Sequence, residues 1–319
     1  MAVYRIGDII RMKREALGIT REKLCELSEE ICSPQTLYRM EYGKVKVKQE
    51  VYRKLMECMG ELPERNYASV IVSNYQDLHL KKEIGMHMFR GEYEKAGEKL
   101  EQLEKSMDTG YVRNKQYVGR MKINLKKGLE ENHSPEEYLN DLWDSLRLTI
   151  PNLNQIDMEK WPYNGEEYNI ICSILGTYTI LKWREKEEEL LLKLIENNDK
   201  RYIEEDYYIS RGTNYLDSLS QVMSITNQHE RAIIYCKDGI EKGKKQRLLA
   251  SVYHFLYDIV WNREQMIKKE MLSKKERESC KRLLVQAYYI SVACKEDYHS
   301  ERIKRLCNKL YPEELRFYL

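Results

Sequence analysis

The sequence predicts an all-α protein built from two kinds of helical array. Apolar residues recur at helical spacing along nearly all of its 319 residues, whereas the period-2 patterns of strands bounded by turn residues are essentially missing. The composition agrees, because only 6 Pro and 15 Gly occur beside 33% charged and 42% hydrophobic residues. This mixture is typical of long amphipathic helices, in a chain of roughly two domains' length.

The N-terminal fifth is expected to be a domain of its own. Residues 1–65 break into short helices of about 8–14 residues, and Pro63 places the end of this domain near residues 62–65. Residues 66–319 would form a second domain of longer, paired helices. The first 65 residues hold 13 Lys and Arg against 11 Asp and Glu, and the rest hold 41 of each, so the formal net charge of +2 lies in the first domain.

Two helix starts and a shared apolar face can be identified in the first domain. Thr20 and Ser33 can act as N-caps, since their hydroxyls accept hydrogen bonds from the unpaired N–H groups of a helix start. Leu24, Leu37 and Met40 supply the apolar face that would hold the helices together.

Five helix pairs and a closing helix are predicted in the second domain. They are expected at about 77–107, 111–149, 166–197, 203–243 and 246–292, with the last helix at about 298–311. Ser134 and Ser273 mark two helix starts, because each offers a capping hydroxyl before an acidic first turn. Pro151 and Pro162 bound the one long irregular connection.

Two similar segments mark the turns of helix pairs. Gly91-Glu92-Tyr93-Glu94-Lys95-Ala96 and Asn227-Gln228-His229-Glu230-Arg231-Ala232 resemble the tetratricopeptide turn, in which a small alanine lets two helices approach closely. One pair cannot bury its own apolar face, so neighbouring pairs must stack and the last helix must cap the end. We expect a superhelix whose concave wall is the binding surface.

Residues 4–60 resemble the helix-turn-helix of the phage-repressor-like (XRE) family. The matching segments are Ile6-Gly7-Asp8-Ile9-Ile10, Gly18-Ile19-Thr20-Arg21-Glu22 and Ser33-Pro34-Gln35-Thr36-Leu37-Tyr38-Arg39. The resemblance implies a DNA-binding domain that places its third helix in the major groove. The candidate base contacts are Gln35, Thr36, Tyr38 and Arg39. Glutamine suits adenine and arginine suits guanine, because each can form a bidentate pair with its base.

Contacts to the DNA backbone are expected from four further residues. Lys44 and Lys46 follow the third helix and alternate with valines, and the resemblance places phosphate contacts there and at Arg21 and Ser33. Such contacts position a protein without reading sequence. For any one lysine the alternative is a solvated charge.

The segment from Cys25 to Cys32 departs from the family pattern. It is longer than the usual turn, and it adds negative charge at Glu29 and Glu30 near the proposed DNA face. The angle of the third helix therefore depends on this turn, while Ile31 is expected to keep filling the core.

A DNA reader followed by tetratricopeptide-like repeats resembles the Rap, Rgg, NprR, PlcR and PrgX group of peptide-sensing regulators of Gram-positive bacteria. The resemblance extends over nearly the whole chain. It implies a cytoplasmic quorum-sensing transcriptional regulator that binds a double-stranded DNA operator. It also implies that the repeats bind a short signalling peptide and mediate homodimerisation.

Candidate peptide contacts follow from the helical register of the repeats. They are Asn169, Cys172, Gly176 and Thr179 in the third unit, Asn214, Asp217, Gln221 and Ser224 in the fourth, and His254, Tyr257 and Asp258 in the fifth. An amide suits a peptide groove, because it offers a donor and an acceptor to an extended backbone. The alternative is structural: the two asparagines would satisfy polar groups between helices, and His254 would be a core residue.

Tyrosine is unusually common, with 25 Tyr against 3 Phe. Tyrosine rings pack while their hydroxyls find partners, which suits adaptable ligand contacts as well as repeat packing. The candidates for either role are Tyr207, Tyr208, Tyr253, Tyr257, Tyr288 and Tyr289.

Nothing in the sequence predicts a cofactor, a metal site or catalysis. The 8 cysteines include no CxxC pair and are expected to be reduced thiols. The 6 histidines form no local acid–base or metal motif, and no G-x-S-x-G, H-E-x-x-H or P-loop pattern occurs. No apolar run approaches the ~20 residues that cross a bilayer, so no membrane association is expected.

Two hypotheses of different class remain. In the first, the protein is a peptide-responsive transcriptional regulator. In the second, it is a DNA-binding adaptor whose repeats dock a folded partner protein.

Overall fold

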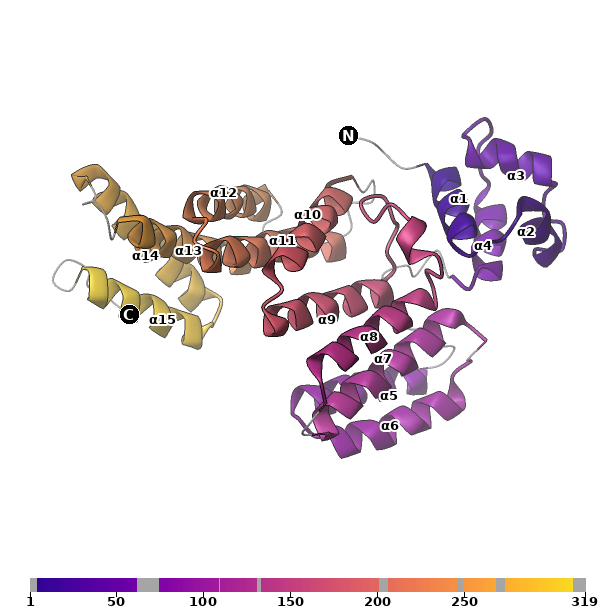
Figure 1. The fold of residues 1–319 in the computed structure, drawn as a ribbon, viewed down its shortest axis with the longest axis horizontal. Coiled ribbons are helices and arrows are strands. Elements are labelled where there is room, and N and C mark those ends of the chain that lie inside the picture. The colour runs from indigo at the N-terminus through magenta and orange to yellow at the C-terminus, as the bar shows by residue number, and fades with distance from the viewer. Residues whose placement is uncertain are drawn as a thin grey trace. The chain divides into compact units, whose positions relative to one another are not determined.

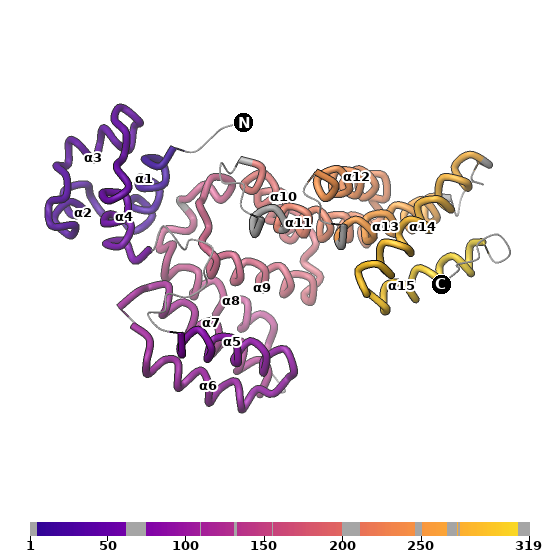
Figure 2. Tube along the Cα trace, turned by 180° about the vertical axis from the view of Figure 1, so that it is seen from behind, coloured from indigo at the N-terminus to yellow at the C-terminus, as the bar shows by residue number. Residues whose placement is uncertain are grey.

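The computed structural model describes residues 5–61, 75–108, 110–130, 133–200, 206–245, 249–267 and 273–311. All regular structure in these ranges is helical, which confirms the predicted fold class (Figures 1 and 2). The chain divides into two compact units, Met1–Trp183 and Arg184–Leu319. The predicted boundary at residues 62–65 lies outside the described residues and stays a prediction.

Unit 1 begins with four short helices: α1 (Ile6–Ala16), α2 (Arg21–Leu27), α3 (Pro34–Glu41) and α4 (Gln49–Cys58). The first three correspond to the predicted helices, and we call α1 to α4 the head. Both predicted caps are present. Thr20 Oγ1 accepts a hydrogen bond of 3.1 Å from the backbone N–H of Lys23, and Ser33 Oγ accepts one of 3.2 Å from that of Thr36.

The core of the head contains the predicted apolar residues. Leu24 and Leu37 are fully buried and Met40 is nearly so. Gly7 lets α1 and α3 approach closely, because a Cβ at this position would overlap the carbonyl oxygen of Met40. Leu55 of α4, a helix for which no range was predicted, completes this core.

Helix pairs follow the head. Unit 1 continues with α5 (Tyr75–Phe89), α6 (Tyr93–Ser106), α7 (Val112–Leu129), α8 (Pro135–Arg147) and α9 (Gly165–Leu181), with a short 3-10 helix at Leu153–Gln155. Unit 2 consists of α10 (Arg184–Lys200), α11 (Asp206–Ile225), α12 (His229–Lys245), α13 (Leu249–Ile267), α14 (Lys274–Ala293) and α15 (Asp297–Leu310). Consecutive helices such as α5 and α6, or α11 and α12, lie side by side (Figures 1 and 2).

The same tight turn joins four of these consecutive pairs. Gly91, Lys182, Asn227 and Lys295 all have left-handed backbone conformations, with φ between 58° and 72°. In each case the next residue donates its N–H to the carbonyl five residues earlier, as between Gln228 and Met223 (2.8 Å). The next helix begins two residues after the left-handed one. This pattern satisfies carbonyl groups that a helix end leaves unpaired.

A small buried side chain follows three of these turns. Ala96, Ala232 and Ser300 lie five residues after the left-handed residue, and all three are buried. Glu187 takes the equivalent position after the turn at Lys182 and is buried as well. The two predicted tetratricopeptide-like turns are thus members of a set of four.

Close helix packing in unit 2 depends on Gly239. A Cβ on this α12 residue would overlap the ring of Phe255 in α13, and Phe255 itself is fully buried. The absence of a side chain therefore lets the aromatic ring lie directly against the α12 backbone.

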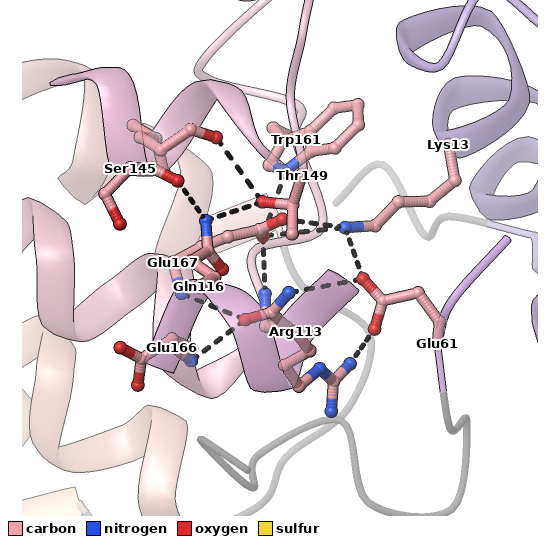
Figure 3. A network of polar contacts seen from close by, with 11 residues as sticks. Lys13, Glu61, Arg113, Gln116, Ser145, Thr149, Trp161, Glu166 and Glu167 are labelled. Carbon is pink, nitrogen blue, oxygen red and sulfur yellow. Dashed lines mark hydrogen bonds and ion pairs between the residues drawn. The ribbon is translucent and has the colours of Figure 1, made fainter. Parts of the chain in front are cut away.

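A buried ionic cluster connects the head to the helix pairs of unit 1 (Figure 3). Lys13 Nζ of α1 lies 3.1 Å from Glu61 Oε1 and 3.2 Å from Glu167 Oε1 at the start of α9. Arg113 of α7 forms a second ion pair with Glu61. The side chain of Lys13 is only 3% exposed, so these charges are paired away from water.

Polar neighbours hold Glu167 in place within this cluster. Its Oε2 accepts hydrogen bonds from Trp161 Nε1 (3.2 Å) and from the backbone N–H of Asn164 (2.8 Å). Burial alone would raise the pKa of Glu167, but Lys13 and these hydrogen bonds hold the pKa below its ordinary value. Glu167 is therefore ionised in the folded protein at neutral pH.

Candidate functional sites

The exposed face of α3 carries three of the four residues predicted to contact bases. Gln35, Tyr38 and Arg39 are exposed, while Leu37 points into the core. Thr36 is half-buried, and its hydroxyl shares a hydrogen bond of 2.9 Å with Ser33 Oγ. The helix thus presents an amide, a phenol and a guanidinium on one accessible surface.

Arg21 has a structural role in addition to the one predicted for it. Its Nε donates a hydrogen bond of 2.7 Å to the fully buried Glu41, which also accepts one of 2.6 Å from Arg14. The Arg21 guanidinium lies 5.2 Å from the ring centre of Tyr38. Arg21 therefore ties α2 to α3 and supports Tyr38, and its contact with DNA phosphate stays a prediction.

The lysines after α3 are accessible. Lys44 and Lys46 are exposed, and the intervening Val45 is half-buried. Lys44 Nζ lies 4.9 Å from the ring centre of Tyr38, so a positive charge stands directly beside the exposed surface of α3. The alternation predicted from the sequence places the charges outward here.

The unusually long turn before α3 has a defined backbone conformation. Glu29 and Glu30 are both left-handed, with φ of 57° and 56°, and the N–H of Glu30 donates to the carbonyl of Cys25 (2.8 Å). Lys54 of α4 lies 3.3 Å from the carboxylate of Glu29. Ile31 is only half-buried, so its contribution to the core is smaller than predicted.

A cavity of about 240 Å³ in unit 2 brings together several predicted peptide contacts. Gln221, Ser224, His254, Tyr257 and Asp258, from α11 and α13, all line it. The remaining lining residues are Ile225, Tyr253, Trp261, His299, Arg302 and Ile303. We call this cavity the α11–α13–α15 pocket.

Other predicted contacts lie outside the pocket. Asp217 is adjacent to it, because its Oδ2 accepts a hydrogen bond of 3.0 Å from Gln221 Nε2. Asn214 is exposed on the same helix but does not line the cavity. Asn169 belongs to unit 1, where it lies on the same face of α9 as the exposed Cys172, Gly176 and Thr179.

The tyrosines divide between packing and the pocket. Tyr253 and Tyr257 line the pocket. Tyr288 is fully buried and Tyr289 is half exposed on α14, away from the pocket. The side chains of Tyr207 and Tyr208 lie outside the described residues.

Sequence reasoning missed five residues of the pocket, the apolar Ile225 and Ile303 and three side chains with polar atoms. His299 and Arg302 come from α15, which was predicted only as a capping helix, and no local pattern signals that they meet α13. The Arg302 guanidinium lies 4.7 Å from the ring centre of Tyr257, and the rings of His254 and His299 are 4.5 Å apart. Trp261 lies one helical turn after Tyr257, so the register of α13 could have identified it.

Burial changes the titration of the pocket's ionisable groups. It raises the pKa of Asp258 to about 7, with help from the nearby Asp217, and it raises the pKa of Asp217 to about 6. Burial together with His299 and Arg302 lowers the pKa of His254 to about 4. At neutral pH, His254 is therefore uncharged, and Asp258 is close to its midpoint.

In the part of the chain that the structure describes, no helix is long and apolar enough to cross a bilayer. The same residues contain no group of three or more His, Cys, Asp or Glu side chains placed to hold a metal ion. All eight cysteines are free thiols.

Comparison with known proteins gives two kinds of match. Residues 10–65 match the family model for the helix-turn-helix. No curated protein sequence matches the chain significantly.

Solved structures resemble the chain over almost its full length. The apo form of PlcR from Bacillus thuringiensis has a TM-score of 0.54 at 11% identity, with 93% of this chain and 98% of that chain covered. PlcR in complex with the peptide PapR7 and DNA has a TM-score of 0.53 at 14% identity, with 94% and 98% covered. A cysteine-to-serine variant of the SHP pheromone receptor Rgg2 from Streptococcus dysgalactiae has a TM-score of 0.50 at 14% identity, with 98% and 100% covered.

These matches agree with the geometry of the two sites. The helix-turn-helix match covers the head with its exposed α3, and the structures that share the fold are those of a DNA- and peptide-bound protein and a pheromone receptor. Residues 10–65 thus match a helix-turn-helix domain, and the chain shares its fold, over nearly its full length, with PlcR and Rgg2.

Proposed function

We propose that the protein is a sequence-specific DNA-binding transcriptional regulator of the cytoplasm, whose repeats bind a short signalling peptide and mediate dimerisation. The observation that carries the proposal is the arrangement of α3. Gln35, Tyr38 and Arg39 are presented to solvent on a short helix whose other face is locked into the head. This is the arrangement by which a recognition helix reaches base edges in the major groove.

Binding to the DNA backbone would position this helix. Lys44 and Lys46 follow α3 with their side chains exposed, and the capped N-terminus at Ser33 adds the positive end of a helix dipole. Positive groups beside the reading surface suit phosphate contacts, which are common in protein–DNA complexes. The DNA present in the PlcR complex supports this assignment.

The α11–α13–α15 pocket is the proposed contact point for the peptide. It combines the amide of Gln221 and the hydroxyl of Ser224 with the aromatic rings of Tyr257 and Trp261. Apolar walls with a few polar groups are typical of ligand sites. The structure of PlcR with the peptide PapR7 lends support from a protein of the same fold.

Dimerisation follows from the demands of DNA recognition. One α3 reads few base pairs, and helix-turn-helix proteins usually bind paired half-sites as dimers. Sedimentation of the purified protein with and without its operator would measure the association state. A monomer that binds a single half-site with full affinity would contradict this part of the proposal.

Selection of DNA sequences by the purified protein, followed by binding measurements, tests the DNA-reading function. Gln35→Ala and Arg39→Ala are each expected to cost about 1–3 kcal/mol against the preferred base, whereas Lys46→Ala should weaken all sequences equally and reduce the salt slope by about 1. Lys122→Ala, on the exposed surface of α7, is the control. Absence of any sequence preference at low salt would contradict the proposed sequence-specific DNA binding.

Thermal unfolding tests whether the repeats bind a short peptide. A signalling peptide that binds the folded state should raise the melting temperature in a concentration-dependent way. A rise only with a folded partner protein would instead favour the adaptor hypothesis.

A further inference from the structure

The α11–α13–α15 pocket has the carboxyl group of Asp258 in its lining and that of Asp217 directly beside it. Asp217 Oδ1 is buried and accepts no hydrogen bond from the described residues, while its Oδ2 accepts one from Gln221. Asp258 lines the cavity, and the charge of Arg302 acts on both carboxyl groups. A buried carboxylate without a full set of donors is costly, so a ligand that supplies donors and positive charge would be favoured there.

The charged and titratable groups around Asp258 come from three other helices as well as its own. α11 contributes Asp217, α12 contributes the neutral thiol of Cys236, and α15 contributes Arg302 and His299. His254, on α13 itself, is uncharged at neutral pH because its pKa is lowered to about 4. When both carboxylates are ionised, two negative charges therefore face one positive charge.

The guanidinium of Arg302 leaves this imbalance in place. It stacks over the ring of Tyr257 at 4.7 Å, and its charge offsets only part of the effect of burial on the two carboxyl groups. Its position also shows that an aromatic wall of the pocket accepts a cation on its face. The rings of Tyr253 and Trp261 line the same cavity, and aromatic faces attract cations electrostatically.

We propose that the pocket binds a positively charged group of the signalling peptide, either its N-terminal ammonium or a lysine or arginine side chain, with Asp217 and Asp258 as the counter-ions. The inference rests on the proposed peptide-binding function and specifies the chemistry of the ligand. An ammonium or guanidinium group supplies the donors that Asp217 Oδ1 lacks, and it neutralises the repulsion between the two carboxylates.

Proton release should accompany binding. The pKa of Asp258 is about 7, so Asp258 is mostly protonated at pH 6 and mostly ionised at pH 8. A lysine or arginine side chain binds the ionised form and displaces the proton, so the affinity for it should rise about tenfold between pH 6 and pH 8. The rise should be smaller for an N-terminal ammonium, because its own pKa is about 8. Asp258→Asn, which cannot ionise, should reduce this pH dependence to the smaller change that comes from Asp217, whose pKa is about 6.

The test uses a randomised synthetic heptapeptide library as the probe, in a free N-terminal form and an N-acetylated form. The full-length protein is incubated with each form, and retained peptides are identified by mass spectrometry. We expect retained peptides to be enriched in lysine and arginine, or to be lost on acetylation. Asp217→Asn and Asp258→Asn should abolish this selectivity, whereas Asp238→Asn, at an exposed position of α12, should preserve it.

Each outcome separates this inference from the function on which it rests. Retention of peptides without preference for a positive charge, or a preference unchanged in both Asn variants, would overturn the inference and leave peptide binding standing. Enrichment of acidic peptides that disappears in Arg302→Gln would overturn it in favour of an anionic ligand. If neither library form is retained while DNA binding is intact, both the inference and the peptide-binding function fail.

Folding of the variants is controlled in the same experiment. Asp217→Asn and Asp258→Asn remove a like-charge repulsion, so their melting temperatures at pH 8 should equal or exceed that of the parent. The pH dependence of affinity for the most enriched basic peptide then provides a second readout that a packing defect would not change.

Discussion

Lys13 of α1 and Glu167 of α9 form a buried ion pair of 3.2 Å although they lie 154 positions apart in the sequence (Figure 3). Their side chains are 3% and 0% exposed. Through this pair, the first helix of the head contacts a helix of the repeat array directly. The head is therefore held against α9 by a buried ion pair as well as by the covalent chain.

Substitution Lys13→Met should strongly destabilise unit 1. It removes the shared cation and leaves the buried carboxylates of Glu61 and Glu167 without it, and loss of one partner of a buried pair typically costs about 3–5 kcal/mol. Chemical denaturation measures the loss. Lys23→Met removes an exposed pair with Glu26 and should cost less than about 1 kcal/mol. Equal effects of the two substitutions would show that the buried cluster contributes no more than a surface pair.

Gly239→Ala should disrupt the packing of α12 against α13. The new Cβ would overlap the ring of Phe255, and overpacking of a core typically costs about 1–3 kcal/mol. Gly85→Ala in α5 is the matched control, since nothing lies within 4 Å of a Cβ there. In an open helical position the change should stabilise by about 0.5–1 kcal/mol. Thermal unfolding should therefore shift in opposite directions for the two variants.

The turn before α3 should be strained at Glu30. This residue is left-handed with φ of 56°, a conformation that costs a residue with a Cβ about 1–2 kcal/mol and glycine much less. Glu30→Gly should therefore raise the free energy of unfolding by up to about 1 kcal/mol. Glu26→Gly, inside α2, should lower it by about 1 kcal/mol. A loss of stability in both variants would contradict the assignment of strain.

Stability should fall as the pH rises from about 4 to above 7, because of Asp217 and Asp258. Their folded-state pKa values are raised to about 6 and about 7, so the folded protein binds more protons than the unfolded chain in this window. The unfolding free energy therefore decreases with rising pH by several kcal/mol, since each pKa unit corresponds to about 1.4 kcal/mol.

Denaturation measured between pH 5 and pH 8 checks this slope. Asp258→Asn should reduce the slope of unfolding free energy against pH, and Asp238→Asn should leave that slope unchanged. A stability that increases steadily toward pH 8 in the parent protein would show that the two carboxyl groups are not protonated in the folded state.

Local patterns in the sequence were sufficient for the helix pairs and for three of the four helices of the head, but not for α4. Helical periodicity located the helix pairs, because it depends on residues within a few turns of one another. Ser33 and Thr20 identified two helix starts for the same reason. Gly91 and Asn227 revealed two turns, because both residue types tolerate left-handed conformations. Lys182 and Lys295 adopt the same conformation but give no such signal.

Only the tertiary structure decided which distant residues meet. The register of α11 and α13 placed Gln221, His254 and Tyr257 on a common wall, but the approach of Arg302 from α15 depends on how helix pairs stack. The same holds for Lys13 and Glu167. The spacing of residues in the sequence determines which face of each helix is apolar. Which faces meet is decided by close packing of the whole chain, because residues far apart in sequence must fit together there.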